Sequence, residues 1–154
     1  MPVKPIPPGY HTVTPYLIVK DGVAALEFYK KAFGAEEILR HEMNGKIGHA
    51  EIKIGDSMVM LADEFPEMGA TAPQKPGGAG VGFALYVEDC DKLFARAIAA
   101  GATEQRPLKD QFYGDRSGTL VDPFNHQWTI STHKEDVSPD EMKKRMEKAG
   151  KECG

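Results

Sequence analysis

Apolar and polar residues follow one succession of patterns in the first half of the chain. Residues 13–21 (VTPYLIVKD) alternate as a half-buried strand does, and residues 22–37 then place apolar side chains at helical spacing. Gly34 supplies a helix stop. Turn signals then separate three further predicted strands, which cover residues 36–43, 48–54 and 57–64.

The same succession restarts after a stretch rich in glycine and proline. Residues 81–89 (VGFALYVED) predict a strand, and residues 90–102 predict a helix that ends near Gly101. VTPYLIVKD aligns with VGFALYVED, and KAFGAEE aligns with AAGATEQ, which gives a repeat of about seventy residues. The three strands that close the second copy cover residues 103–109, 115–122 and 127–133.

The repeat predicts an α+β fold in which two βαβββ modules form a curved mixed sheet shaped as a cup, followed by a C-terminal helix. Proline at positions 2, 5, 7 and 8 makes the start of the chain an extended arm. We expect one structural domain overall. Its predicted parts are the arm 1–11, the first module 12–65, a linker 66–79, the second module 80–133 and a helical tail 134–154.

The tail carries a helix start signal. Ser138 is placed to cap the helix, Pro139 suits the first turn, and Glu141 completes a capping box. Met142 and Met146 give the helix a narrow apolar stripe. Two interpretations stay open: the helix packs on its own domain or a sister subunit, or it binds a dedicated partner.

Composition excludes several classes of function. The 154 residues are 41% hydrophobic and 27% charged, which is typical of a globular protein. A net charge of −4 without a basic stripe argues against nucleic acid as a partner. No apolar run approaches a membrane span, and the start lacks the pattern of a signal peptide. Two cysteines without a CxxC suggest no disulfide framework, so we expect a cytoplasmic protein.

Three runs carry a resemblance to a known family: FYKKAFGAEE, GHAEIKIGDSMVMLAD and FYGDRSGTLVDPFNHQWTISTHKEDVSPDEM. With the doubled module, residues 12–133 resemble the vicinal oxygen chelate superfamily, which includes glyoxalases, bleomycin-resistance proteins and extradiol dioxygenases. The runs are most similar to the PhnB-like subgroup. The resemblance implies a cup that holds a small molecule, often in a homodimer. The subgroup has no single reaction, so it implies the fold more firmly than the function.

The resemblance also implies where metal ligands would lie. In metal-dependent families, first-strand histidines and fourth-strand glutamates point into the cup. Here the first-strand positions fall at Thr14 and Gly82, and the fourth-strand positions at Met60 and Thr129. None of these is a usual ligand of a divalent ion. We therefore predict no metal site and no cofactor.

Strand alternation predicts which side chains line the cup. In the motif GHAEIKI, His49, Glu51 and Lys53 share one face, and the His-x-Glu pair suits acid-base chemistry. The alternative is a solvated strand face with an incidental ion pair. Asp115 takes the place of His49 in the repeat, so the two could face one another across the cup or line symmetric halves of it. The full predicted ligand pocket comprises Thr14, Tyr16, His49, Glu51, Met60, Gly82, Tyr86, Phe112, Tyr113, Asp115, Gln127 and Thr129, with His49, Glu51 and Asp115 as catalytic candidates.

Residues around the predicted bend at Gly114 allow two interpretations. Phe112 and Tyr113 either clamp a flat ligand or close the sheet edge. Arg116 points away from the cup by alternation, which predicts an ion pair with Asp115, Asp122 or the tail. Three histidines, His11, His126 and His133, are expected to be exposed, and Cys90 is expected to be structural.

Three functions from different classes follow. The first is a metal-independent protein that binds a small molecule in the cup. The second is an enzyme, such as a lyase, isomerase or dioxygenase-like enzyme, with an atypical site at His49 and Glu51. The third is a structural module that binds a partner through its second half. The small-molecule binder is the leading hypothesis, with a homodimer as its expected assembly.

Overall fold

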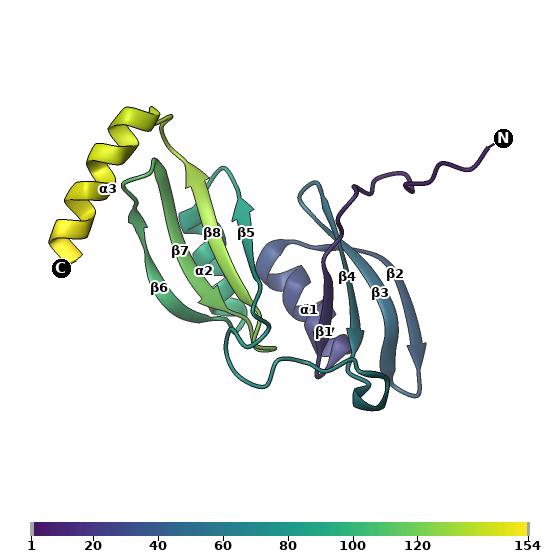
Figure 1. Cartoon of the computed structure of the whole chain (residues 1–154). Coiled ribbons are helices and arrows are strands. Elements are labelled where there is room, and N and C mark those ends of the chain that lie inside the picture. The colour runs from purple at the N-terminus through teal and green to yellow at the C-terminus, as the bar shows by residue number, and fades with distance from the viewer. Residues whose placement is uncertain (1, 154) are drawn as a thin grey trace.

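The computed structural model describes residues 2–153 and contains two βαβββ modules followed by a C-terminal helix (Figure 1). Met1 and Gly154, the outer ends of the predicted arm and tail, lie outside the described residues. The α+β fold and the C-terminal helix predicted from the sequence are confirmed. The first module contains β1 (Tyr16–Val19), α1 (Gly22–Phe33), β2 (Glu36–Met43), β3 (Lys46–Ile54) and β4 (Ser57–Asp63).

The second module repeats this order of elements. In each module the first strand pairs parallel with the last, and the other neighbours are antiparallel. The sheet orders are therefore β1-β4-β3-β2 and β5-β8-β7-β6. The second set of elements is β5 (Gly82–Tyr86), α2 (Cys90–Ala100), β6 (Thr103–Asp110), β7 (Asp115–Val121) and β8 (Gln127–His133), and α3 (Pro139–Cys153) follows it.

Aspartates set where the first strand of each module ends and its helix begins. Asp21 caps α1 by accepting a hydrogen bond from the backbone N–H of Ala24 at 3.0 Å, and Asp89 caps α2 in the same way through Lys92 at 3.0 Å. The predicted strands ran through these aspartates. The observed strands are shorter because the caps commit the chain to a helix.

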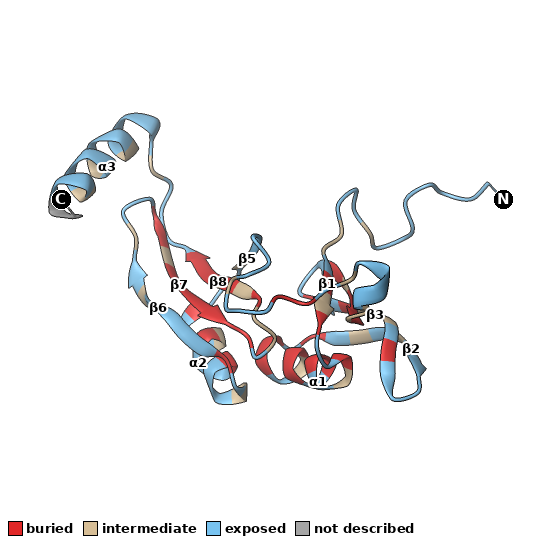
Figure 2. Cartoon of the chain, turned by 60° about the horizontal axis from the view of Figure 1, so that its bottom comes forward, coloured by how far each residue is buried: buried red, intermediate tan, exposed pale blue. Residues whose placement is uncertain are grey.

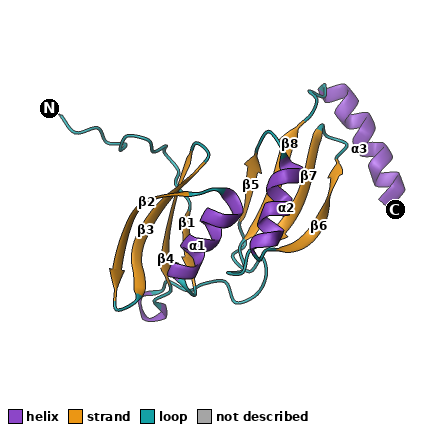
Figure 3. Ribbon diagram, turned by 180° about the vertical axis from the view of Figure 1, so that it is seen from behind, coloured by secondary structure: helices purple, strands orange, loops and turns teal. Residues whose placement is uncertain are grey.

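The core joins the two modules. Helices α1 and α2 pack against one another on the same side of the molecule (Figure 3). The buried ring of Trp128 on β8 lies 4.8 Å from that of Phe33 and 5.6 Å from that of Tyr29, both on α1. Figure 2 shows the buried residues gathered along α1, β7 and β8. Burial of these rings drives the modules together.

Each helix covers one face of the sheet in its own module. The other face of each sheet, which no described helix covers, is called the open face. In the described residues the strands form two separate four-stranded sheets, so no strand pairing joins them. The connection between the modules contains a short helix, η1 (Pro66–Met68), and an isolated bridge between Phe65 and Ala70. The N-terminal arm extends away from both modules, and α3 projects from the end of the second (Figure 1). No described helix is long and apolar enough to cross a membrane.

Candidate functional site

A chain of hydrogen bonds crosses the open face of the first sheet. The hydroxyl of Tyr16 on β1 lies 2.8 Å from Nδ1 of His49 on β3, and Nε2 of His49 lies 2.8 Å from Oε2 of Glu51. When Glu51 is ionised, Nε2–H donates to it, which leaves Nδ1 to accept the proton of the Tyr16 hydroxyl. An imidazole between a carboxylate and a hydroxyl can move a proton to or from that hydroxyl.

Register explains why these side chains meet. Tyr16 pairs with Met60, and Met60 pairs on its other side with Glu51, so the three residues form one row across the sheet. His49 lies two residues before Glu51 and therefore points to the same face. Its side chain retains 28% of its accessible surface, and that of Glu51 retains 14%. The predicted His-x-Glu pair thus lies side by side on the open face.

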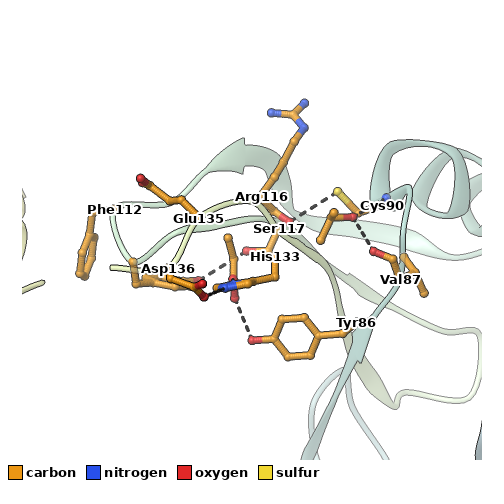
Figure 4. A network of polar contacts seen from close by, with 12 residues as sticks. Tyr86, Val87, Cys90, Phe112, Arg116, Ser117, His133, Glu135 and Asp136 are labelled. Atoms are coloured by element: carbon orange, nitrogen blue, oxygen red, sulfur yellow. Dashed lines mark hydrogen bonds and ion pairs between the residues drawn. The ribbon is translucent and has the colours of Figure 1, made fainter. Parts of the chain in front are cut away.

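A second polar network lies on the open face of the second sheet (Figure 4). Asp115 on β7 accepts a hydrogen bond from the Tyr86 hydroxyl at 2.8 Å, and its other oxygen lies 2.8 Å from Nδ1 of His133. Asp136 lies 2.8 Å from Nε2 of the same imidazole. Asp115 is buried although it is a carboxylate. Hydrogen bonds with Tyr86 and His133 stabilise its carboxylate in this buried position.

The network shifts the pKa values of its members. Hydrogen bonds to Asp115 and then to Asp136 raise the pKa of His133 above its ordinary value. The hydrogen bond to Asp115, followed by burial, raises the pKa of Tyr86. A protonated His133 therefore stays paired with Asp115. The sequence pattern placed His133 at an exposed strand end, which is correct, but gave no sign of its two carboxylate partners.

His49 and Asp115 have different hydrogen-bond partners. They lie on β3 and β7, which belong to different sheets. Among the described residues no hydrogen bond or ion pair joins the two side chains, and their facing across the cup stays a prediction. Each instead belongs to its own tyrosine-containing network.

A cavity of about 500 Å³ opens on the second sheet. Of the predicted pocket residues, Tyr113 and Thr129 line it. The Tyr113 hydroxyl lies 3.5 Å from Oγ of Ser117, and Oγ1 of Thr119 lies 3.2 Å from Oγ1 of Thr129. Sequence reasoning missed the other seven lining residues, which are Arg106, Pro107, Lys109, Gln111, Ser117, Gly118 and Thr119.

The remaining predicted pocket residues are more dispersed. Gly82 and Gln127 are paired at the start of β5 and β8, and Thr14 precedes β1. Phe112 packs edge-to-face on Tyr113 with ring centroids 5.2 Å apart, and both side chains remain more than a third exposed. Gly114 has a φ of 100°, so the predicted tight bend is confirmed.

The four strand positions implied for a metal do not fit one. Thr14, Met60, Gly82 and Thr129 offer no imidazole and no carboxylate, the donors that a divalent ion would take there. Across the part of the chain that the structure describes, no group of three or more His, Cys, Asp or Glu residues is arranged to hold a metal ion.

The expected exposure of His126 is wrong, because its side chain is buried at 4% exposure. Asn125 turns the chain with a φ of 72°, and Asp122 accepts the backbone N–H of His126 at 3.0 Å. The turn directs the ring toward the first module, where Nε2 lies 3.0 Å from the carbonyl oxygen of Ile18. It also lines a cavity of about 550 Å³ beside the connection between the modules.

The expected partners of Arg116 are also wrong. Its guanidinium pairs with Asp91 at 2.9 Å and with Asp110 at 3.4 Å, rather than with Asp115, Asp122 or the tail. Strand alternation correctly pointed Arg116 away from the open face, but it does not say which helix covers the other side. Cys90 is buried as expected, with its thiol 3.5 Å from the carbonyl oxygen of Arg116.

Comparison with known proteins agrees with this architecture. A family model described as Glyoxalase/Bleomycin resistance protein/Dioxygenase superfamily matches residues 10–130. Uncharacterized protein Mb0911c of Mycobacterium bovis is 39% identical over 142 residues, covering 90% of this chain and 93% of the relative.

Solved structures extend the comparison to the fold. TioX from Micromonospora sp. ML1 superposes with a TM-score of 0.63 at 25% identity, covering 83% of this chain and 100% of that one. The Arabidopsis thaliana gene product At5g48480 gives a TM-score of 0.63 at 24% identity, covering 79% of this chain and 98% of its own. At 24% identity, the similarity to the At5g48480 structure supports the fold alone.

Proposed function

We propose that this chain, which belongs to the Glyoxalase/Bleomycin resistance protein/Dioxygenase superfamily, is a metal-independent protein that binds a small molecule on the open faces of its sheets. The single observation that carries the proposal is the cavity of about 500 Å³ on the second sheet. Its volume is in the range of small-molecule sites, and its wall combines hydroxyls, an aromatic ring and backbone. The donor chemistry at Thr14, Met60, Gly82 and Thr129 supports binding without a metal.

We further propose the PhnB-like subgroup, a homodimeric assembly and a cytoplasmic location. The long run over residues 112–142 supports the subgroup. Tyr16 and Tyr86 support the dimer, since they stand on the open faces with 48% and 66% of their surface exposed. A second copy could cover these faces and complete the cup. Light scattering tests the assembly: a mass of one chain at micromolar concentration would reject the dimer.

A screen of small molecules by thermal unfolding tests the binding function. Compounds that stabilise the protein should do so saturably and without being consumed. Replacement of Tyr113 by Ser should weaken their binding, because the Tyr113 ring lines the cavity. Met68→Ala is the control, since Met68 lies on η1 and is 84% exposed. Hits that bind equally to both variants would argue for a different site.

A second candidate function, acid-base catalysis, is favoured by the hydrogen-bond chain from Tyr16 through His49 to Glu51. The Tyr16 hydroxyl would act as the acid or base on a bound substrate, with His49 carrying its proton and Glu51 stabilising the imidazolium. Glu51→Gln retains the size of the side chain and removes its charge. A compound whose turnover survives both Glu51→Gln and His49→Ala would exclude this mechanism.

A further inference from the structure

We propose that the cavity on the second sheet is an oxyanion site, in which Arg106 and Lys109 bind a carboxylate or phosphate group of the ligand. The proposal rests on the binding function above and names the chemical class of its ligand. Both cationic side chains line the cavity, and the lining includes neither aspartate nor glutamate. The cavity therefore presents positive charge without an acidic counterpart.

A β-bulge brings the two cations to the same face. Arg106 pairs with Thr119 on β7, and Lys109 pairs with Ser117, so three steps on β6 correspond to two on β7. Strict alternation would put residues three apart on opposite faces of the strand. The extra residue of the bulge turns the Lys109 side chain to the face that also carries Arg106. Pro107 lies inside the bulge on an edge strand, where its missing N–H is tolerated.

The two cations lack an acidic partner within the part of the chain that the structure describes. Among the described residues, Arg106 and Lys109 take part in no ion pair, whereas Arg116 on the opposite face of β7 pairs with both Asp91 and Asp110. Two unpaired cations that line one cavity repel one another, and a bound anion relieves this repulsion. A guanidinium also matches a carboxylate or phosphate through two parallel hydrogen bonds.

Neutral donors surround the cations. Each cation pairs in register with a hydroxyl residue, which places Thr119 beside Arg106 and Ser117 beside Lys109. The hydroxyls of Thr129 and Tyr113 extend this row, at 3.2 Å from Thr119 and 3.5 Å from Ser117. A hydroxyl can rotate to donate its proton to an oxyanion. Charge and donors thus converge on one cavity.

Amide NMR spectra of the full chain, titrated separately with inorganic phosphate and acetate at constant ionic strength, test the proposal. We expect saturable shifts at Arg106, Leu108, Lys109, residues 117–119 and Thr129. A stronger response to phosphate identifies a tetrahedral anion, and a stronger response to acetate identifies a carboxylate. Arg106→Gln and Lys109→Gln should each weaken binding about tenfold, as expected for loss of one charge-assisted contact. Arg106→Lys keeps the charge and should recover part of the affinity.

The control is Arg116→Gln, which removes the same charge on the opposite face and should leave the titration unchanged. The proposal is overturned when chloride produces the same shifts, or when the double variant Arg106→Gln, Lys109→Gln still binds both anions while remaining folded. Should uncharged compounds bind at Tyr113 while both anions fail, the oxyanion site is rejected and the binding function stands. Should nothing bind, both are rejected.

Discussion

Tyr29 of the first module donates a 2.5 Å hydrogen bond to the buried carboxylate of Asp122 in the second. Trp128 donates to the same oxygen at 2.8 Å, and the other oxygen accepts the backbone N–H groups of Phe124 and His126. Burial, followed by the charge of Asp122, raises the pKa of Tyr29 well above its ordinary value, so the phenol remains a donor. One carboxylate therefore fixes the turn before β8 and joins the modules.

Replacement of Tyr29 by Phe should lower the free energy of unfolding by about 1–3 kcal/mol, because a buried charge loses one donor. Denaturant unfolding measures the change. Tyr16→Phe is the control, since its hydroxyl binds His49 on an exposed face and should contribute less. Equal losses of unfolding free energy in the two variants would mean that the buried contact between the modules stabilises the fold no more than the exposed one.

The pKa of His133 predicts a dependence of stability on pH. Because this pKa is raised above 6.5 in the folded chain, the pairing with Asp115 and Asp136 stabilises the fold fully below the unfolded value. That stabilisation is lost as the pH rises through the folded pKa. His133→Gln should flatten the pH profile of unfolding in this window. An NMR titration that gives His133 a pKa at or below 6.5 would contradict the prediction.

Gly118 should resist substitution, because the backbone of the bulged strand β6 and the ring of Phe94 leave no room for a Cβ. A Cβ at this position would lie 2.9 Å from the backbone nitrogen of Leu108, 3.0 Å from the Phe94 ring and 3.1 Å from the carbonyl oxygen of Arg106. Gly118→Ala should destabilise the fold by about 1–3 kcal/mol and displace the bulge that positions Arg106.

The matched control is Gly48→Ala on β3, where the nearest atom to a Cβ lies at 3.6 Å. Gly118→Ala should change both the thermal unfolding temperature and the phosphate titration. Gly48→Ala should change neither. An unchanged titration in Gly118→Ala would show that the bulge does not depend on this close approach.

Metal chelation should leave the thermal unfolding temperature unchanged, and added zinc, nickel, manganese or iron should not raise it. The reason is the chemistry of Thr14, Met60, Gly82 and Thr129, which are not ligands of such ions. Elemental mass spectrometry of the purified protein supplies the stoichiometry. One tightly bound equivalent per chain that is lost in His49→Ala would contradict the prediction.

The sequence by itself determined the repeat, the order of the elements and the facing of most strands. These features are local: alternation, helical spacing and capping residues such as Asp21 and Asp89 act within a few neighbours. The same alternation put His49 and Glu51 on one face, and the structure has them in contact at 2.8 Å.

Only the tertiary structure decided which distant groups meet. His126 is buried because the first module supplies the carbonyl oxygen of Ile18, and Arg116 finds Asp91 because α2 covers that face. Alternation assigns Arg106 and Lys109 to opposite faces. Pro107 indicates an edge strand or a bulge, but it does not indicate which side chains the bulge brings to one face. A bulge depends on how β6 pairs across space with β7, so its effect on the cavity is settled by packing rather than by the sequence of the strand.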